Sequence, residues 1–431
     1  MKNNPTILIT GASGFVGSYL VEYFLDKGLK VRAMTKSGQY FIDHPHLEVV
    51  HGDMRNLGSL YEATLGVSSV VHLAAAKQDE KDSFEINVSG AKNLVKAAVQ
   101  NKVDLIVNIS TASTKIAQKG IYGETKNLAD QIFEQSQIST ITLKPSLIYK
   151  DLKNAAFGSL VKFSRLPITP VFGSGECQFR PIYIEDFAKA ICIALQDIKL
   201  KNKTYDVVGP SIVSMNTLIK LIGYKILNKK VRIIHVPAKL GFLLVRMLSL
   251  IFYKSPITRS NILGSTQDIE MDYQSFVKDF GFNPKNLTEG LEILKKELVF
   301  DEAKLILSYA VSRSLPKIKI TNREKQLYYQ TVSKGNISSN FSDLIYKHPF
   351  ILGPLEFLSN FYKNAVLPQK IYIAMVIIEC SPSSAEWLLP KSRSIFNILF
   401  QATYLSLSFL LKVFLSLFFI PFPNFVKRNV A

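Results

Sequence analysis

The first 150 residues alternate between short apolar runs and longer segments with helical periodicity, and this alternation limits the possible folds more than any other feature. Strands that are apolar along their whole length and are separated by helices form βαβ units, in which helices cover both faces of a parallel sheet. The sequence therefore predicts an α/β fold with a doubly wound parallel sheet. The expected strands are Ile7–Thr10, Lys30–Thr35, Leu47–His51, Val70–Ala74, Leu105–Ser110 and Thr140–Lys144.

A glycine-rich turn joins the first expected strand to the first expected helix. Residues 10–17 read TGASGFVG, with glycine at every third position. In such a turn the first glycine permits the sharp bend, the second lets backbone amides approach a pyrophosphate, and the third lets the helix pack close to the strand. The helix N-terminus adds unpaired amide donors. We therefore predict that this turn binds a dinucleotide, through Gly11, Ser13, Gly14, Phe15, Val16 and Gly17.

The ends of the next strands predict further contacts to the dinucleotide. An NAD site usually carries an acidic residue at the end of the second strand, but the sequence there is VRAMTK. Lys36, or Arg32, could instead contact a 2′-phosphate, which slightly favours NADP over NAD; Lys36 could equally be one more surface lysine. Asp53, followed by Met54, comes where a carboxylate can accept from the adenine amino group or cap a helix. Small residues then end the fourth strand and would lie flat against the cofactor: Leu73, Ala74 and Ala75.

A tyrosine and a lysine lie four residues apart in a predicted helix. Tyr122 and Lys126 would therefore share one helical face. Upstream, ISTAS (109–113) ends a strand at the sheet edge where open α/β folds bind ligands. A phenol titrates near 10, so acid–base work at neutral pH needs a nearby cation. We predict that Lys126 supplies this charge and that Thr111 orients the substrate oxygen, although such a pair can also bind ribose without catalysis.

Together these motifs resemble the extended and atypical short-chain dehydrogenases/reductases of the NAD-dependent epimerase/dehydratase superfamily. The resemblance covers residues 5 to about 195. Tyr122 follows Thr111 by only 11 positions, a shorter spacing than in most sugar-nucleotide epimerases of this family. With the segment 205–291, this is similar to the subgroup of the nucleotide-binding accessory subunit of respiratory complex I. The motifs are TGASGFVG (10–17), HGDM (51–54), VVHLAAA (70–76), NVSGAKNLVKAA (87–98), ISTAS (109–113), YGETK (122–126), PSLIY (145–149) and RPIYIEDFAKAI (180–191).

The resemblance implies roles for individual residues. Thr111, Tyr122 and Lys126 would form a catalytic triad, and Asn87 would stabilise a helix kink and a proton-relay water. In some members of the subgroup the cofactor is structural and no turnover is known. The remaining implied residues are Pro145 and Ile148 along the nicotinamide, and Arg180 and Asp186 on the substrate side.

Residues 394–420 form an apolar run of 27 residues in which Lys412 is the only charge. About 20 mainly apolar residues suffice for a helix to cross about 30 Å of hydrocarbon. A membrane-embedded or spanning tail, an in-plane amphipathic anchor and a buried globular helix all fit the run. We expect the first, which predicts a protein at the cytoplasmic face of a membrane, with the tail as a single-pass C-terminal anchor.

Three regions follow from these patterns. Residues 1–150 would form the NAD(P)-binding Rossmann domain, and residues 151–300 a smaller α/β substrate lobe interleaved with the last sheet strands. Residues 301–431 would form a helical extension that ends in the apolar tail. The polar residues 1–5 lead directly into a strand, so no secretory peptide is expected.

Composition limits the class of protein further. Lys+Arg 52 against Asp+Glu 34 gives a net charge of +18, which fits a solvated lysine-rich surface or anionic phosphate partners. The lysines are scattered and no aromatic stacking platform is evident, so nucleic acid is not an expected partner. The three cysteines lack metal-site spacing, and we expect no metal, no disulfide framework and a reducing compartment.

The resemblance and the apolar tail together imply an NAD(P)(H)-dependent oxidoreductase. It would transfer hydride between the nicotinamide and a carbonyl or alcohol carbon of a small lipophilic substrate at the membrane. A sugar-nucleotide epimerase or dehydratase, and a non-catalytic cofactor-stabilised membrane-complex or assembly protein, are the alternatives. The oligomeric state is not predicted.

Overall fold

The computed structural model describes residues 6–77, 80–150, 155–251, 259–314, 322–334 and 366–379, together with residues 352 and 355. The chain divides into two compact units, Met1–Leu294 and Lys295–Ala431.

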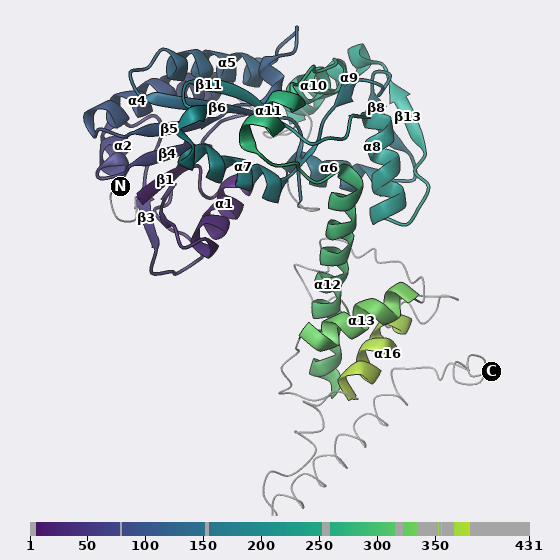
Figure 1. Ribbon diagram of the computed structural model, residues 1–431. Coiled ribbons are helices and arrows are strands. Elements are labelled where there is room, and N and C mark those ends of the chain that lie inside the picture. The colour runs from purple at the N-terminus through teal and green to yellow at the C-terminus, as the bar shows by residue number, and fades with distance from the viewer. Residues whose placement is uncertain are drawn as a thin grey trace, which may run out of the picture. The chain divides into compact units, whose positions relative to one another are not determined.

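The first unit is built on a seven-stranded sheet with the order β11-β6-β5-β4-β1-β2-β3 (Figure 1). Every neighbouring pair is parallel. The predicted doubly wound α/β fold is confirmed. The strand order changes direction between β1 and β4, and open α/β sheets bind ligands at the carboxyl ends of the strands at such a point. The strands are β1 (Thr6–Thr10), β2 (Lys30–Thr35), β3 (Leu47–His51), β4 (Ser69–His72), β5 (Leu105–Ile109), β6 (Ser139–Pro145) and β11 (Lys203–Val207).

Helices cover both faces of this sheet, which explains why its strands are apolar throughout. In β1, Ile7 and Ile9 belong to one buried cluster, whereas Leu8 between them belongs to a second cluster on the opposite face. Side chains alternate between the faces of a strand, so each residue of β1 needs an apolar partner. The surrounding helices are α1 (Phe15–Asp26), α2 (Leu57–Thr64), α3 (Glu80–Ser83), the π-helix η1 (Phe84–Ser89), α4 (Gly90–Gln100), the 3-10 helices η2 (Ala112–Thr114) and η3 (Ile198–Leu200), α5 (Ile121–Glu134), α7 (Ile184–Gln196) and α11 (Tyr273–Phe280).

The rest of the first unit forms a smaller α/β lobe around the carboxyl ends of β5 and β6. Its short sheets pair β8 with β13 in parallel, β9 with β12 antiparallel, and β7 with β10 in parallel. The strands are β7 (Ile148–Tyr149), β8 (Thr169–Phe172), β9 (Gln178–Phe179), β10 (Ile182–Tyr183), β12 (Val213–Ser214) and β13 (Ile233–Val236). The helices are α6 (Ala155–Ser164), α8 (Met215–Leu221), the π-helix η4 (Ile222–Ile226), α9 (Ala238–Ile251) and α10 (Arg259–Ser265).

The second unit contains helical segments around their own apolar core, which includes Ile306, Tyr328 and Ile371. A buried ion pair lies in this core, with Lys370 Nζ 2.7 Å from Glu302 Oε1. The helices are α12 (Leu287–Ser314), which begins in the first unit, α13 (Asn322–Lys334) and α16 (Val366–Glu379).

The predicted apolar tail at 394–420 lies outside the described residues. Among the helices that the structure does describe, none has both the length and the apolar character required to cross a bilayer.

Candidate functional site

The glycine turn takes the conformation that its spacing predicts. Gly11 has φ +71°, and a Cβ placed there would lie 2.8 Å from the amide nitrogen of Ala74. A Cβ at Gly17 would lie 2.9 Å from Cα of Ala12, so only glycine lets α1 pack this closely. Gly14 is the N-cap of α1 and supplies no side-chain cap. The first amides of a helix have no partner inside the helix, so those of Phe15, Val16 and Gly17 suit a diphosphate.

A hydroxyl group at the end of β1 connects this turn to β4. Thr10 Oγ1 accepts hydrogen bonds of 3.2 Å from the amides of both Leu73 and Ala74. Its own hydrogen is then free to be donated to Nδ1 of His72, 2.9 Å away. His72 is fully buried, and burial holds its pKa well below the usual value, so the imidazole is neutral. The predicted strand Val70–Ala74 ends at His72 in the structure. The amides of the next two residues, Leu73 and Ala74, donate to the Thr10 side chain.

The predicted adenine side contains a compact group of charges at the ends of β2 and β3. Lys36 Nζ lies 3.6 Å from Asp53 Oδ2, and the Lys36 side chain is 62 % exposed. Arg55 binds the same carboxylate at 2.7 Å and 3.1 Å, and this pairing lowers the pKa of Asp53. Sequence reasoning missed Arg55, although it follows the HGDM motif directly. The Met54 side chain is buried in the core, so only its backbone can face a cofactor.

Arg32 is committed to other contacts. Its guanidinium donates to Glu48 at 2.7 Å and to the carbonyl oxygens of Ala63 and Leu65 at 2.9 Å and 2.7 Å. Of the two cations considered for a 2′-phosphate, Lys36 is therefore the one whose ammonium remains accessible.

Tyr122 and Lys126 lie in α5 with a second lysine beside them. The ammonium of Lys77 is 5.3 Å from the centre of the Tyr122 ring. Lys126 is only 2 % exposed, and burial lowers its pKa to about 8, against the opposing effect of Asp130. Within the described part of the chain, Lys126 makes no hydrogen bond or ion pair. A buried ammonium without partners suits the hydroxyl groups of a bound ribose.

Asp130 anchors a polar network next to Lys126 that the sequence did not single out. Its carboxylate accepts hydrogen bonds from Ser110 at 2.6 Å and Asn108 at 2.9 Å, and lies 3.2 Å from Lys144. The network ties the end of β5 to α5. Asp130 follows Lys126 by four residues on the same helical face, and this spacing was the available signal.

Thr111 follows β5 and begins the short helix η2. Its Oγ1 accepts the amide of Ser113 at 3.2 Å and lies 3.3 Å from the Ser113 hydroxyl. Gly123 packs directly on the carbonyl of Ser113, where a Cβ would lie 2.6 Å from the oxygen. This close packing brings the start of α5, which carries Tyr122, against the segment that carries Thr111.

Asn87 lies in the π-helix η1, at the position where the resemblance implies a helix kink. Its amide donates to the Ala76 carbonyl at 3.0 Å and to Thr125 Oγ1 at 2.9 Å, and its Oδ1 accepts the Ala76 amide at 2.8 Å. Asn87 therefore holds the segment after β4 against α5, beside Lys126. Its implied part in a proton relay stays a prediction.

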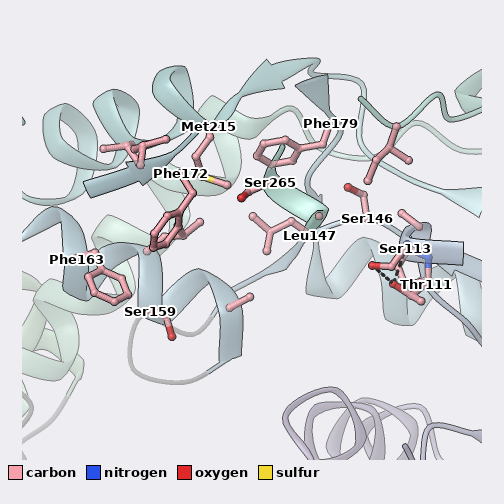
Figure 2. A pocket seen from close by; sticks show the side chains of 18 of the residues that line it. Thr111, Ser113, Ser146, Leu147, Ser159, Phe163, Phe172, Phe179, Met215 and Ser265 are labelled. Atoms are coloured by element: carbon pink, nitrogen blue, oxygen red, sulfur yellow. Dashed lines mark hydrogen bonds between the residues drawn. The ribbon is translucent and has the colours of Figure 1, made fainter. Parts of the chain in front are cut away.

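A cavity of about 340 Å³ begins at Thr111 and Ser113 and extends into the smaller lobe. Figure 2 shows these two hydroxyls at one end, and Phe163 and Phe172 at the other. None of the described lining residues is charged. They are Thr111, Ala112, Ser113, Pro145, Ser146, Leu147, Ala156, Ser159, Leu160, Phe163, Thr169, Pro170, Val171, Phe172, Phe179, Met215, Ile219, Gly264, Ser265 and Ile269.

The other predicted residues lie around this cavity rather than in it, apart from Pro145. Ile148 is half-buried and packs against the main core. Arg180 donates to the carbonyl of Pro210 at 3.0 Å and stacks on Tyr273. Asp186 is buried and accepts both the amide and the ammonium of Lys285, at 2.8 Å and 3.1 Å. The structure thus engages Arg180 and Asp186 in contacts that fix the lobe, outside the cavity wall.

Residues 7–208 match the model of the NAD dependent epimerase/dehydratase family. This part of the chain is therefore similar to that family. The match supports the prediction of an NAD-dependent enzyme. The glycine cradle and the unpartnered Lys126 fit such a cofactor.

Curated relatives include two kinds of enzyme. The chain is 24 % identical over 262 residues to N-acetyl-alpha-D-glucosaminyl-diphospho-ditrans,octacis-undecaprenol 4-epimerase of Escherichia coli O157:H7, covering 56 % of this chain and 78 % of that protein. It is 31 % identical over 176 residues to a 3-beta-hydroxysteroid dehydrogenase of Mycolicibacterium neoaurum, covering 33 % of this chain and 47 % of that protein. The chain thus spans less than half of the steroid dehydrogenase.

Solved structures share the fold at lower identity. The dTDP-glucose 4,6-dehydratase DesIV of Streptomyces venezuelae, solved with NAD, has a TM-score of 0.55 at 17 % identity and covers 68 % of this chain and 96 % of its own. The UDP-glucose 4-epimerase of Thermus thermophilus, also with NAD, has a TM-score of 0.53 at 18 % identity, with coverages of 67 % and 97 %. These likenesses concern the fold, and both neighbours carry NAD.

Proposed function

We propose that this protein is an NAD(P)(H)-dependent oxidoreductase acting on an alcohol or carbonyl group of an uncharged, lipophilic substrate. The observation that carries the proposal is the 340 Å³ cavity, which starts at Thr111 and Ser113 and whose described lining is free of charge. When bound, the dinucleotide supplies the hydride donor or acceptor.

The character of the cavity favours an apolar substrate body. Its size lies within the usual range for small-molecule sites, and its walls are mainly aliphatic and aromatic with a few hydroxyl groups. A substrate phosphate would be costly to bury there, because buried charges need a partner of opposite charge. A molecule with one reactive oxygen near Ser113 and an apolar body toward Phe163 fits this lining.

Residues next to the Thr111 end of the cavity can handle the proton. During carbonyl reduction the Tyr122 hydroxyl would donate its proton to the developing alkoxide. The ammonium groups of Lys77, beside the Tyr122 ring, and of Lys126, one turn along α5, would stabilise the negative charge left on the phenol oxygen. The hydroxyl groups of Thr111 and Ser113 would hold the substrate oxygen in place.

The proposal includes a slight preference for NADP. The end of β2 has Lys36 where an NAD site would usually have an acid, and Arg55 adds a second cation nearby. The Asp53 carboxylate between them would retain its contact to the adenine.

A second candidate is an epimerase acting on a diphosphate-linked sugar. The observation in its favour is the match to the undecaprenol-linked epimerase, which extends over 262 residues and 78 % of that protein. Such a reaction returns the hydride to the substrate, so no dinucleotide would be consumed overall.

The third possibility is a non-catalytic, cofactor-stabilised protein of a membrane complex, similar to the accessory subunit of respiratory complex I. The 11-residue spacing of Thr111 and Tyr122 is the feature that favours it.

We also propose that the protein works at the cytoplasmic face of a membrane, with residues 394–420 as its anchor. The length and composition of that run support this location.

The decisive experiment offers full-length protein two classes of substrate. Uncharged steroid and isoprenoid ketones are incubated with 4-tritiated NADPH or NADH. UDP- and undecaprenyl-diphosphate-linked sugars are incubated separately with oxidised NAD or NADP. Transfer of tritium to an uncharged ketone supports the proposal. Isomerised sugar without net cofactor consumption would support the epimerase, and bound dinucleotide without either reaction would support the non-catalytic role.

A further inference from the structure

We propose that one face of the smaller lobe docks on an anionic lipid bilayer, and that the substrate enters the cavity from this bilayer. The inference rests on the proposed function, because it names the surface through which that site would receive a lipophilic substrate. The docking face consists of five apolar residues, Leu166, Ile168, Ile234, Leu240 and Leu243, and three basic residues, Lys230, Arg232 and Lys239.

The apolar half of the docking face is exposed to solvent. Its five side chains are 43 %, 53 %, 52 %, 47 % and 53 % exposed, in chain order. Single exposed apolar residues are common, but a group of them marks a binding surface.

The pairing of β8 with β13 places Ile168 and Ile234 on one side of their sheet. Ile234 pairs with Pro170 in parallel register, and Ile168 precedes Pro170 by two residues. Paired residues, and residues two apart along a strand, point to the same face. Phe172 belongs to this face as well, and its ring packs against Gly241 of α9. Helix α9 therefore lies on the same side, and it presents Leu240 and Leu243 to solvent, one helical turn apart.

Basic side chains accompany the apolar ones without acidic neighbours in the chain. Residues 207–267 contain nine lysines and arginines and no aspartate or glutamate. Lys230, Arg232 and Lys239 are exposed, and none of the three makes an ion pair within the part of the chain that the structure describes. Arg232 precedes Ile234 by two residues, so positive charge and apolar surface share one face.

The same elements also form the far end of the cavity. Phe163, at the end of α6, and Phe172, in β8, line the cavity opposite Thr111 (Figure 2). The connection from α6 to β8 carries Leu166 and Ile168, and Lys229 fixes it by donating to the carbonyl oxygens of Arg165 and Leu166. The docking face and the cavity therefore meet at Phe172, which belongs to both.

An anionic bilayer fits this surface better than other partners. Exposed aliphatic side chains beside lysine and arginine can insert below the headgroups while the cations contact the anionic lipids. A nucleic acid would engage only the basic residues. Each basic side chain near an anionic surface strengthens binding about fivefold.

Depth-dependent quenching in vesicles tests the inference on the full chain. In a variant with serine at Cys177, Cys192 and Cys380, a fluorophore is attached at Ile234→Cys or, as a matched control on the sheet domain, at Leu65→Cys, which is also exposed. Vesicles contain phosphatidylcholine with or without phosphatidylglycerol, and a spin-labelled lipid as quencher. We expect quenching at position 234 in anionic vesicles, several-fold above that at position 65.

A charge-reversed variant separates this face from the predicted tail anchor. Lys230→Glu, Arg232→Glu and Lys239→Glu together should abolish quenching at position 234, since docking at this face weakens about 100-fold, even where the tail keeps the protein on the vesicle. Turnover of a vesicle-borne ketone should fall about tenfold, while turnover in detergent stays unchanged, because none of the three residues lines the cavity.

The outcomes distinguish this inference from the proposed function. Turnover in detergent without quenching at position 234 would overturn the docking face and leave the proposed function intact. Quenching without any turnover would support the docking face and contradict the proposed function. Binding of RNA that the charge reversal abolishes, with no lipid quenching, would assign the basic residues to nucleic acid and overturn the inference.

Discussion

Burial destabilises the charged form of Lys126. A bound ligand with hydrogen-bond acceptors would offset this free-energy cost. The Lys126 residue is 2 % exposed, Lys77 and Lys144 lie nearby, and only Asp130 favours its charged form. A bound ribose would supply the missing acceptors. Single residues of this kind show where a site gives up stability for function.

Replacing Lys126 by methionine should stabilise the protein without ligand. The pKa of Lys126 is about 8 in the folded state and 10.5 ordinarily, so between these values the unfolded chain binds more protons. The burial cost is therefore fully present below pH 8 and shrinks as the pH rises toward 10.5. We expect Lys126→Met to raise the free energy of unfolding by up to about 3 kcal/mol at pH 7, with the gain disappearing at high pH. Urea unfolding at several pH values measures this, and a gain independent of pH would contradict it.

Tyr122→Phe should remove catalysis and leave the fold intact. Loss of a general acid or base lowers kcat by about 10² to 10⁴. Dinucleotide affinity should change little, since only the hydroxyl is lost. The control is Tyr224→Phe, at a side chain 70 % exposed in the smaller lobe. Steady-state rates with a lipophilic ketone test this, and unchanged turnover would exclude Tyr122 from the reaction.

Among the elements, the turn between β1 and α1 could be predicted almost completely, because its glycines are required by local geometry. The end of β4 could not, since the amides of Leu73 and Ala74 donate to the side-chain hydroxyl of Thr10, which is 63 and 64 residues away in the sequence. The cavity was also beyond prediction: its lining comes from α6, β8, α8 and α10, which are separated in sequence.

Gly17→Ala should weaken dinucleotide binding by shifting α1. The new Cβ would lie 2.9 Å from Cα of Ala12 and 3.0 Å from its carbonyl oxygen, and overpacking of this kind costs about 1–3 kcal/mol. Gly28→Ala, at a glycine with φ +73° and open space around it, is the control. Calorimetry should show a raised Kd only for Gly17→Ala. Equal Kd values for the two variants would mean that the turn does not position the diphosphate.

A charged side chain placed in the cavity should lower activity on uncharged substrates. Met215→Arg places a cation among the apolar residues near Ile219, and we expect kcat/KM for uncharged ketones to fall about 100-fold or more, because an unpaired charge is costly to bury. Met215→Leu, which keeps the volume, should stay within a few-fold of the wild type. If Met215→Arg left the uncharged substrate unaffected, the cavity would not be the substrate site.

At the scale of the whole molecule, the two units have separate cores, and the second contains a charged pair inside its own. Burial raises the pKa of Glu302 and lowers that of Lys370, while their contact at 2.7 Å opposes both shifts. Tyr328 adds a hydrogen bond of 3.2 Å to the same carboxylate oxygen. Such a pair depends on both members remaining together.

Glu302→Gln should therefore destabilise the second unit selectively. Removing one member of a buried pair costs about 3–5 kcal/mol, so hydrogen exchange in α12, α13 and α16 should accelerate. The double variant Glu302→Leu with Lys370→Met should restore protection, because no charge stays unpaired. Dinucleotide affinity of the first unit serves as the internal control. Unchanged exchange in Glu302→Gln would mean that the pair does not stabilise these helices.

The sequence by itself determined the parallel sheet, the glycine turn and the spacing of Tyr122 and Lys126, because each depends on periodicity within a few residues. Only the tertiary structure decided which charges are available: Arg32 is used by Glu48 and two carbonyls, and Asp186 by Lys285. It also decided that the cavity beside Thr111 has no charge among its described residues. The reason is physical: a side chain's partner depends on strand register and helix packing between distant segments, which local patterns do not specify.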